Sequence, residues 1–221
     1  MSSHIIVMLT HNDQTVENAI DIFESCSDLP IENWGFKDIG LEKKDMDILI
    51  KSMKKTGKKT YLEVVTYSER NCMDGAKLAV DMGFDYLMGT IYYKSVFEFL
   101  SNQNIRYLPF CGNIHGNPSI LEGSVEEIIT DARSLLDKGV FGIDLLAFRH
   151  TSGTELAETY CQAIPEPVVI AGSINSLDRL NFIHSINPWG FTMGSALFEK
   201  KFAIGENFRS NLVKVKEHLD S

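Results

Sequence analysis

The run VVIAGSINSLDRLNFIHSINPWGFTMGSALF, from Val168 to Phe198, decides the fold of this 221-residue chain. It contains two short apolar strands, Val168–Ala171 and Gly190–Met193, each followed directly by Gly-Ser, with a helical segment between them. Neighbouring parallel strands end at the same edge of a sheet, so Gly172-Ser173 and Gly194-Ser195 are expected to form adjacent turns. Such turns present bare N–H groups beside helix N-termini, and that geometry holds a phosphate.

The rest of the chain alternates strand and helix signals in the same way. Short runs rich in β-branched, Leu or aromatic residues are separated by amphipathic segments such as Val125–Leu136. The expected strands are Ile5–Thr10, Trp34–Ile39, Thr60–Thr66, Tyr86–Ile91, Tyr107–Cys111, Gly142–Ala147, Val168–Ala171 and Gly190–Met193. Strict alternation predicts a parallel sheet with helical crossovers, and eight strands in a chain of this length predict one (β/α)₈ barrel domain over residues 1–221. A doubly wound open sheet is the alternative, but the first strand is followed by THNDQT and not by a glycine-rich dinucleotide loop.

Local signals mark where several helices begin and end. Ser124 with Glu127 three residues later has the pattern of a capping box, which starts a helix. Gly83 and Gly139 stand directly before strand-like runs, where glycine accepts the left-handed conformation that ends a helix. The segment 208–219 is expected to be the last outer helix, which closes the barrel.

Composition excludes several classes of function. The chain has 21 Lys and Arg against 30 Asp and Glu, a net charge of −9, which argues against a general role on nucleic acid or on a membrane surface. No apolar run approaches the roughly 18 residues that span a bilayer, and the N-terminus lacks the basic region of a signal peptide. The four cysteines are scattered without a CxxC pair, so we expect no disulfide framework and a cytoplasmic location.

The two Gly-Ser motifs also carry a family resemblance. AGSI after the seventh strand and MGSAL after the eighth resemble the ribulose-phosphate-binding barrels, the superfamily of phosphoribosylanthranilate isomerase and ProFAR isomerase. The resemblance implies a (β/α)₈ barrel in which Gly172, Ser173, Gly194 and Ser195 bind a sugar phosphate. It identifies no member of the superfamily. The first strand ends in THND, where the isomerases carry an acidic residue or cysteine, and the third strand reads YLEVV, where the decarboxylases and epimerases carry Asp-x-Lys-x-x-Asp.

Three charged residues stand inside otherwise apolar strands and are the candidate catalytic residues. Lys37 lies on the second strand, Glu63 on the third and Asp144 on the sixth. A charge buried without a partner is costly, so such residues are rarely idle. Because side chains alternate along a strand, only one of Lys37 and Asp38 enters the barrel. We favour Lys37, which shares its face with Gly35. A Lys37–Glu63 ion pair that merely fills the barrel is the structural alternative.

Polar residues at the ends of other strands are candidates for substrate binding, because catalysis in these barrels takes place at the carboxyl ends of the strands. They are His11 after the first strand, Thr90 at the end of the fourth and Arg149 after the sixth. Arg149 either neutralises a second acidic group of the substrate or is a surface charge. Asp13 either joins the site or caps a helix that begins near Gln14.

The loop after the fifth strand, PFCGNIHGNPS, is the longest loop of its kind and is a candidate lid. Within it, Cys111 is interpreted as a small core residue and not as a nucleophile. The histidines His11, His115 and His150 are far apart in sequence, so no metal site and no cofactor are expected. A divalent cation, as in the pentulose-phosphate epimerases, stays open as an alternative.

Together these features predict an enzyme that acts on a small phosphorylated sugar or sugar-like metabolite. The favoured reaction is isomerisation or epimerisation by proton transfer next to a carbonyl, with Glu63 or Asp144 as the base and Lys37 stabilising the enolate. One alternative is a lyase in which Lys37 forms a Schiff base. Another is a sensor that binds the phosphometabolite without turnover. Self-association into a homo-oligomer is compatible with a small barrel.

Overall fold

A closed ring of parallel strands forms the centre of the molecule. The computed structural model describes residues 3–220, and the eight strands of its main sheet lie in the order β10-β11-β12-β1-β4-β5-β6-β7, all parallel to their neighbours. They are β1 (His4–Met8), β4 (Asn33–Lys37), β5 (Lys59–Val64), β6 (Tyr86–Gly89), β7 (Arg106–Leu108), β10 (Ile143–Leu145), β11 (Val168–Ile170) and β12 (Gly190–Met193). The ring closes between β7 and β10 through a parallel bridge from Phe110 to Asp144. The predicted (β/α)₈ barrel is therefore confirmed.

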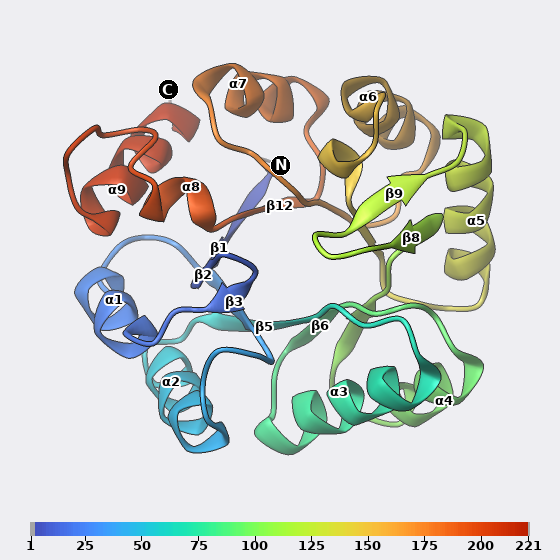
Figure 1. The fold of residues 1–221 in the computed structure, drawn as a ribbon, viewed down its shortest axis with the longest axis horizontal. Helices are drawn as coiled ribbons and strands as arrows, with labels where there is room; N and C mark the ends of the chain where they lie inside the picture. The colour runs from blue at the N-terminus through green and yellow to red at the C-terminus, as the bar shows by residue number, and fades with distance from the viewer. Residues whose placement is uncertain (1–2, 221) are drawn as a thin grey trace.

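Helices surround this ring on the outside (Figure 1). They are α1 (Ala19–Cys26), α2 (Lys43–Lys55), α3 (Glu69–Met82), α4 (Lys94–Ser101), α5 (Val125–Asp137), α6 (Gly153–Ala163), α7 (Leu177–Ile186) and α9 (Phe208–Leu219), with the short α8 (Ser195–Phe198) after β12 and a 3₁₀ turn, η1 (Ala147–Arg149), after β10. The capping box at the start of α5 is present, with Ser124 and Glu127 bonded to each other's backbone N–H. Gly83 ends α3 in the left-handed conformation, as the sequence predicts.

The strands divide the core into two parts because successive side chains point to opposite faces. Trp34 and Phe36 on β4 pack outward against the helices in the larger cluster. The inner faces fill the barrel with Ile6, Met8, Tyr61, Tyr86, Met88, Leu108 and Val169. Tyr61 and Tyr86 stack with ring centroids 4.2 Å apart and close the amino-terminal end of the barrel together with Trp189.

Two antiparallel hairpins interrupt the alternation, and neither is expected from the sequence. The first joins β2 (Thr10–His11) to β3 (Gln14–Thr15), and the second joins β8 (Asn113–His115) to β9 (Ile120–Glu122). Asn12 and Asp13 form the turn of the first hairpin, and both have positive φ, at 51° and 60°. A two-residue turn with positive φ at both positions is the usual connection in such hairpins. The expectation that Asp13 caps a helix near Gln14 is wrong, since α1 begins at Ala19.

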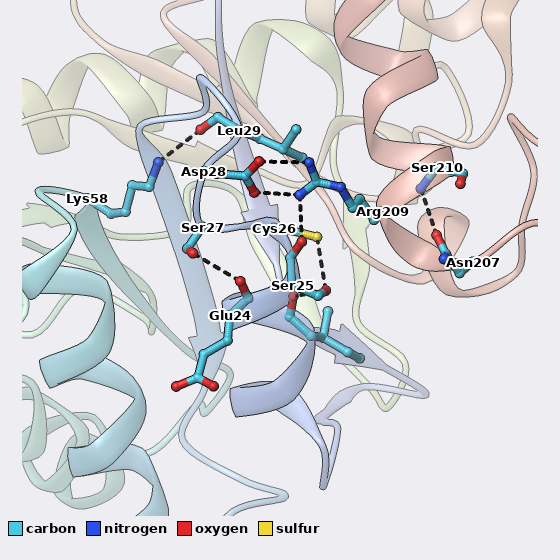
Figure 2. A network of polar contacts seen from close by, with 11 residues as sticks. Glu24, Ser25, Cys26, Ser27, Asp28, Leu29, Lys58, Asn207, Arg209 and Ser210 are labelled. Carbon is cyan, nitrogen blue, oxygen red and sulfur yellow. Dashed lines mark hydrogen bonds and ion pairs between the residues drawn. The ribbon is translucent and has the colours of Figure 1, made fainter.

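The last helix closes the outer layer, as predicted for the segment 208–219. Helix α9 packs against α1, and Figure 2 shows Arg209 of α9 reaching across to the chain that follows α1. Its guanidinium makes two bonds to the Asp28 carboxylate, at 2.5 and 2.8 Å, and a third to the Ser25 carbonyl oxygen. The guanidinium lowers the pKa of Asp28. This fork joins α9 to the chain that follows α1, its neighbour in the outer layer.

A test of barrel packing is Gly35→Ala. A Cβ at position 35 would lie 2.7 Å from the Met8 Sδ and 2.9 Å from the Tyr61 carbonyl oxygen. We expect the substitution to lower the free energy of unfolding by about 1–3 kcal/mol, as overpacked cores do, measured by urea denaturation. The exposed helical change Ser134→Ala is the control and should stay within about 0.5 kcal/mol of the wild type. A Gly35→Ala protein as stable as that control would contradict the packing described.

Candidate active site

A cavity of about 280 Å³ lies at the carboxyl ends of the strands. It contains the residues of both Gly-Ser turns, Gly172, Ser173, Gly194 and Ser195. Lys37, Glu63 and Arg149 also line it, so the structure brings together residues from five separate parts of the sequence. We call this cavity the near lobe.

The Gly-Ser turns form one wall of the near lobe with exposed backbone donors. Gly172 and Ser173 both adopt positive φ, at 88° and 45°, so the chain doubles back after β11. A Cβ on Gly194 would lie 2.9 Å from the carbonyl oxygens of Met8 and Thr10, so only glycine lets this turn approach the end of β1. None of the backbone hydrogen bonds found among residues 3–220 has the amide N–H of these two Gly-Ser pairs as its donor. Gly172 and Gly194 are half-buried, whereas Ser173 and Ser195 are exposed. An anion is a partner that fits such free backbone donors.

Arg149 lies beside the first of these turns. A Cβ built on Gly172 would be 3.3 Å from the Arg149 Cγ and 3.6 Å from its Nε. Within the described part of the chain, its guanidinium makes neither an ion pair nor a hydrogen bond. The arginine is therefore positioned to neutralise an anion at the turn. The expectation that Arg149 neutralises a second acidic group of the substrate stays a prediction.

Opposite the turns, Lys37 forms a charged cluster with two carboxylates. Its Nζ lies 3.2 Å from the Asp13 Oδ1 and 4.0 Å from the Glu63 Oε2. Lys37 and Glu63 are register partners on adjacent strands, and their side chains are only 9% and 14% exposed. Burial by itself would lower the pKa of Lys37, but the charges of Glu63 and Asp13 outweigh burial and the pKa is raised above its usual value. The ammonium therefore stays protonated at neutral pH.

The first hairpin carries Asp13 to this cluster. The buried Thr15 hydroxyl donates to the Lys37 carbonyl oxygen at 2.8 Å and accepts from the Lys37 amide at 2.9 Å. The Thr15 amide donates to the Ile39 carbonyl oxygen. These bonds fix β3 to the end of β4, so the turn that precedes Thr15 places the Asp13 carboxylate over Lys37.

Asp144 lies inside the barrel but does not line the near lobe. Its side chain is fully buried, and neither carboxylate oxygen has a hydrogen-bond partner. Burial raises its pKa well above the usual value, and the nearby charge of Glu63 raises it further, against smaller opposing effects of the Gly89 backbone and of Lys37. The carboxyl is thus close enough to the cluster to respond to its charges, but it lies beneath the floor of the cavity.

The structure leaves two of the predicted substrate-binding residues outside the near lobe. Thr90 is fully buried, and its hydroxyl bonds to the Tyr107 hydroxyl at 2.7 Å. The His11 ring lies 5.7 Å from the Phe198 ring, with its Nε2 3.9 Å from Glu199. Cys111 is fully buried and burial raises its pKa, which agrees with a core role. We therefore do not carry Thr90 or His11 into the candidate site.

Ser119 and Glu199 are two of several polar residues lining the near lobe that sequence reasoning missed. Ser119 comes from the connection between β8 and β9, and Glu199 follows α8. The loop predicted as a lid is thus an ordered hairpin whose connecting residues reach the cavity. The signal for Ser119 is its position in the Gly/Asn-rich segment before β9, whereas Glu199 lies in a helical run without a distinguishing pattern.

Among residues 3–220, no group of three or more His, Cys, Asp or Glu side chains is arranged to hold a metal ion. Over the same residues, no helix is both long and apolar enough to cross a lipid bilayer.

Comparison with known proteins supports the fold and leaves the function open. The sequence matches no protein-family model and no curated protein. Orotidine 5′-phosphate decarboxylase from Pyrococcus horikoshii OT3 has a similar structure, with a TM-score of 0.69 at 13% identity over 98% of this chain and 99% of that one. N-(5′-phosphoribosyl)anthranilate isomerase from Pyrococcus furiosus is also similar, with a TM-score of 0.64 at 12% identity over 99% of this chain and 98% of that one. A mandelate oxidase solved with an FMN adduct has a TM-score of 0.67 at 12% identity, over 98% of this chain and 73% of that one. These matches, at 12–13% identity, confirm the predicted (β/α)₈ barrel fold.

The pH dependence of stability tests the environment of Asp144. Because the pKa of Asp144 is raised in the folded state, the native protein binds a proton that the unfolded chain releases, and stability falls as pH rises between the two pKa values. Asp144→Asn removes the titrating carboxyl and therefore this loss of stability at higher pH. We expect the free energy of unfolding of the variant, relative to the wild type, to rise with pH above about 4, by at most about 1.4 kcal/mol per pH unit. Urea denaturation at a series of pH values measures it, and a difference that does not change with pH would contradict the assignment.

Proposed function

We propose that this protein is an enzyme that acts on a small phosphorylated sugar or sugar-like metabolite. One observation carries the proposal: a single cavity holds the two Gly-Ser turns with Arg149 on one side and the Lys37–Glu63 pair on the other. A substrate held by its phosphate at the turns would extend its carbon chain toward the charged cluster. Fold alone does not decide chemistry in barrels of this type, so the proposal depends on these side chains.

The phosphate would be held mainly by backbone groups. The free N–H groups after β11 and β12 supply donors, and the unpaired Arg149 supplies the charge that a phosphate dianion needs. Loops after the seventh and eighth strands are the usual phosphate site of this fold. Glu199 also lines the near lobe and works against an anion, which makes the contribution of Arg149 more important.

The favoured reaction is proton transfer next to a carbonyl, as in an isomerase or epimerase. Glu63 would take the proton from the carbon and return it, because its carboxylate lies in the cavity and is largely shielded from solvent. The Lys37 ammonium would stabilise the negative charge that develops on the carbonyl oxygen, since it is held protonated and nearly buried. Asp144 does not line the near lobe, so this scheme gives it no contact with the substrate.

A Schiff-base lyase is the second candidate and is less well supported. An amine attacks a carbonyl only in its neutral form, and the raised pKa of Lys37 keeps it protonated. Treatment with borohydride and a ketose phosphate distinguishes the lyase from the isomerase. An adduct on Lys37 by mass spectrometry would establish the lyase and remove the isomerase.

Arg149→Gln tests the phosphate site. The variant loses a charge-assisted bond to the anion, so we expect its affinity for inorganic phosphate to fall about tenfold or more, measured by isothermal titration calorimetry. Arg133→Gln, which makes the same change on an exposed position of α5, is the control and should bind like the wild type. Equal phosphate affinity in both variants would place the anion elsewhere.

Glu63→Gln tests the chemistry. We expect wild-type protein to exchange the α-proton of a ketose or aldose monophosphate with solvent deuterium, and the variant to exchange it about 10²–10⁴-fold more slowly. Proton NMR of the substrate in D₂O follows the exchange. Binding of the same monophosphate is measured in parallel and should persist in the variant. Tight binding without exchange by the wild type would instead identify a sensor that binds its ligand without turnover.

A further inference from the structure

The near lobe continues into a second cavity of about 440 Å³, which we call the far lobe. Asp13, Lys37, Val65 and Ser119 line both cavities, so the two adjoin at the charged cluster. The first hairpin and the connection between β8 and β9 also contribute to the wall of the far lobe, so it lies between the two hairpins. If the phosphate and the carbonyl group of a substrate lie in the near lobe, the rest of its carbon chain would extend past Lys37 into this space.

The charges of the far lobe differ from those of the near lobe. Apart from the shared Lys37, the residues that line it carry no positive charge, whereas Asp13 and Asp38 both line it. The Lys37 ammonium is already held between Asp13 and Glu63. Among residues 3–220, Asp38 has no cation within ion-pair distance, so no direct ion pair neutralises its carboxylate.

The remaining residues that line the far lobe are neutral, and most of them carry side chains that form hydrogen bonds. Asn12, Gln14 and Asn117 bring carboxamides, and Ser119 brings a hydroxyl that already bonds to the Tyr67 hydroxyl at 2.7 Å. Carboxamides both donate and accept, so they match hydroxyl and amino groups. By contrast, the near lobe has the free guanidinium of Arg149 and the backbone donors of the turns.

We propose that the far lobe selects the substrate's second end, accepting a hydroxyl- or amine-bearing group and rejecting a second phosphate or a carboxylate. The inference rests on the proposed function, because it assumes that the phosphate occupies the near lobe. It narrows the substrate class to phosphomonoesters of neutral or amino sugars. Like charges brought together at an interface disfavour a ligand strongly, and the carboxylates of Asp13 and Asp38 supply that repulsion.

Two matched pairs of ligands test the selection. Fructose 6-phosphate is compared with fructose 1,6-bisphosphate, and glucosamine 6-phosphate with 6-phosphogluconate, by calorimetry at constant ionic strength and pH. The first member of each pair should bind at least about tenfold more tightly than the second. Asp38→Asn should reduce this ratio several-fold and leave the affinity for inorganic phosphate unchanged. Asp81→Asn, an exposed change on α3 outside both lobes, should leave the ratio as in the wild type.

The outcomes separate this inference from the proposed function. If the bisphosphate and the gluconate bind as tightly as their partners, or if Asp38→Asn and Asp81→Asn give the same ratio, the selection is wrong while the phosphate site stands. If neither inorganic phosphate nor any monophosphate binds the wild-type protein, the proposed function fails and this inference fails with it.

Discussion

The buried ammonium of Lys37 is the constraint around which the mouth of the barrel is organised. An ammonium that is nine-tenths buried is strongly destabilising without compensating charge. Two elements supply that charge: β5 brings Glu63 into register with Lys37, and the hairpin after β1 brings Asp13 to 3.2 Å. The bonds of Thr15 to the Lys37 backbone secure the second of these. The same arrangement keeps the lysine protonated, which favours an electrostatic role over a nucleophilic one.

In the proposed function, one wall of the cavity binds the phosphate and the opposite wall carries the reacting groups. Backbone groups after β11 and β12 form the wall expected to hold an anion, and they depend on glycines that allow positive φ or close approach. Side chains from β4 and β5 form the opposite wall and carry the charges that could act on a carbon chain. Similar barrels at 12–13% identity include a decarboxylase, an isomerase and an oxidase. The fold by itself therefore leaves the reaction open, and in the proposed function the charged groups of the second wall carry the chemistry.

Much of the barrel could be predicted because its signals are local. Short apolar strands, the capping box at Ser124 and the glycine that ends α3 each depend on a few adjacent residues. The pairing of Lys37 with Glu63 also follows, since neighbouring strands of a parallel barrel bring their inward residues together. The turn at Asn12-Asp13 carries a usable signal, because Asn and Asp tolerate positive φ, but a helix cap uses the same residue types.

Other parts of the site depend on how the chain leaves a strand, which sequence pattern does not determine. Thr90 follows a strand that ends at Gly89, where both residues take positive φ and the hydroxyl turns toward Tyr107 and away from the cavity. Arg149 lies on a 3₁₀ turn that brings it beside Gly172, 23 positions further along the chain.

A crystal structure of the protein with a ketose monophosphate tests the central claim most directly. We expect the phosphate against the Gly172 and Gly194 turns beside Arg149, with the carbonyl within hydrogen-bond distance of the Lys37 Nζ. A phosphate bound outside the near lobe, or a carbon chain directed away from Lys37, would contradict it.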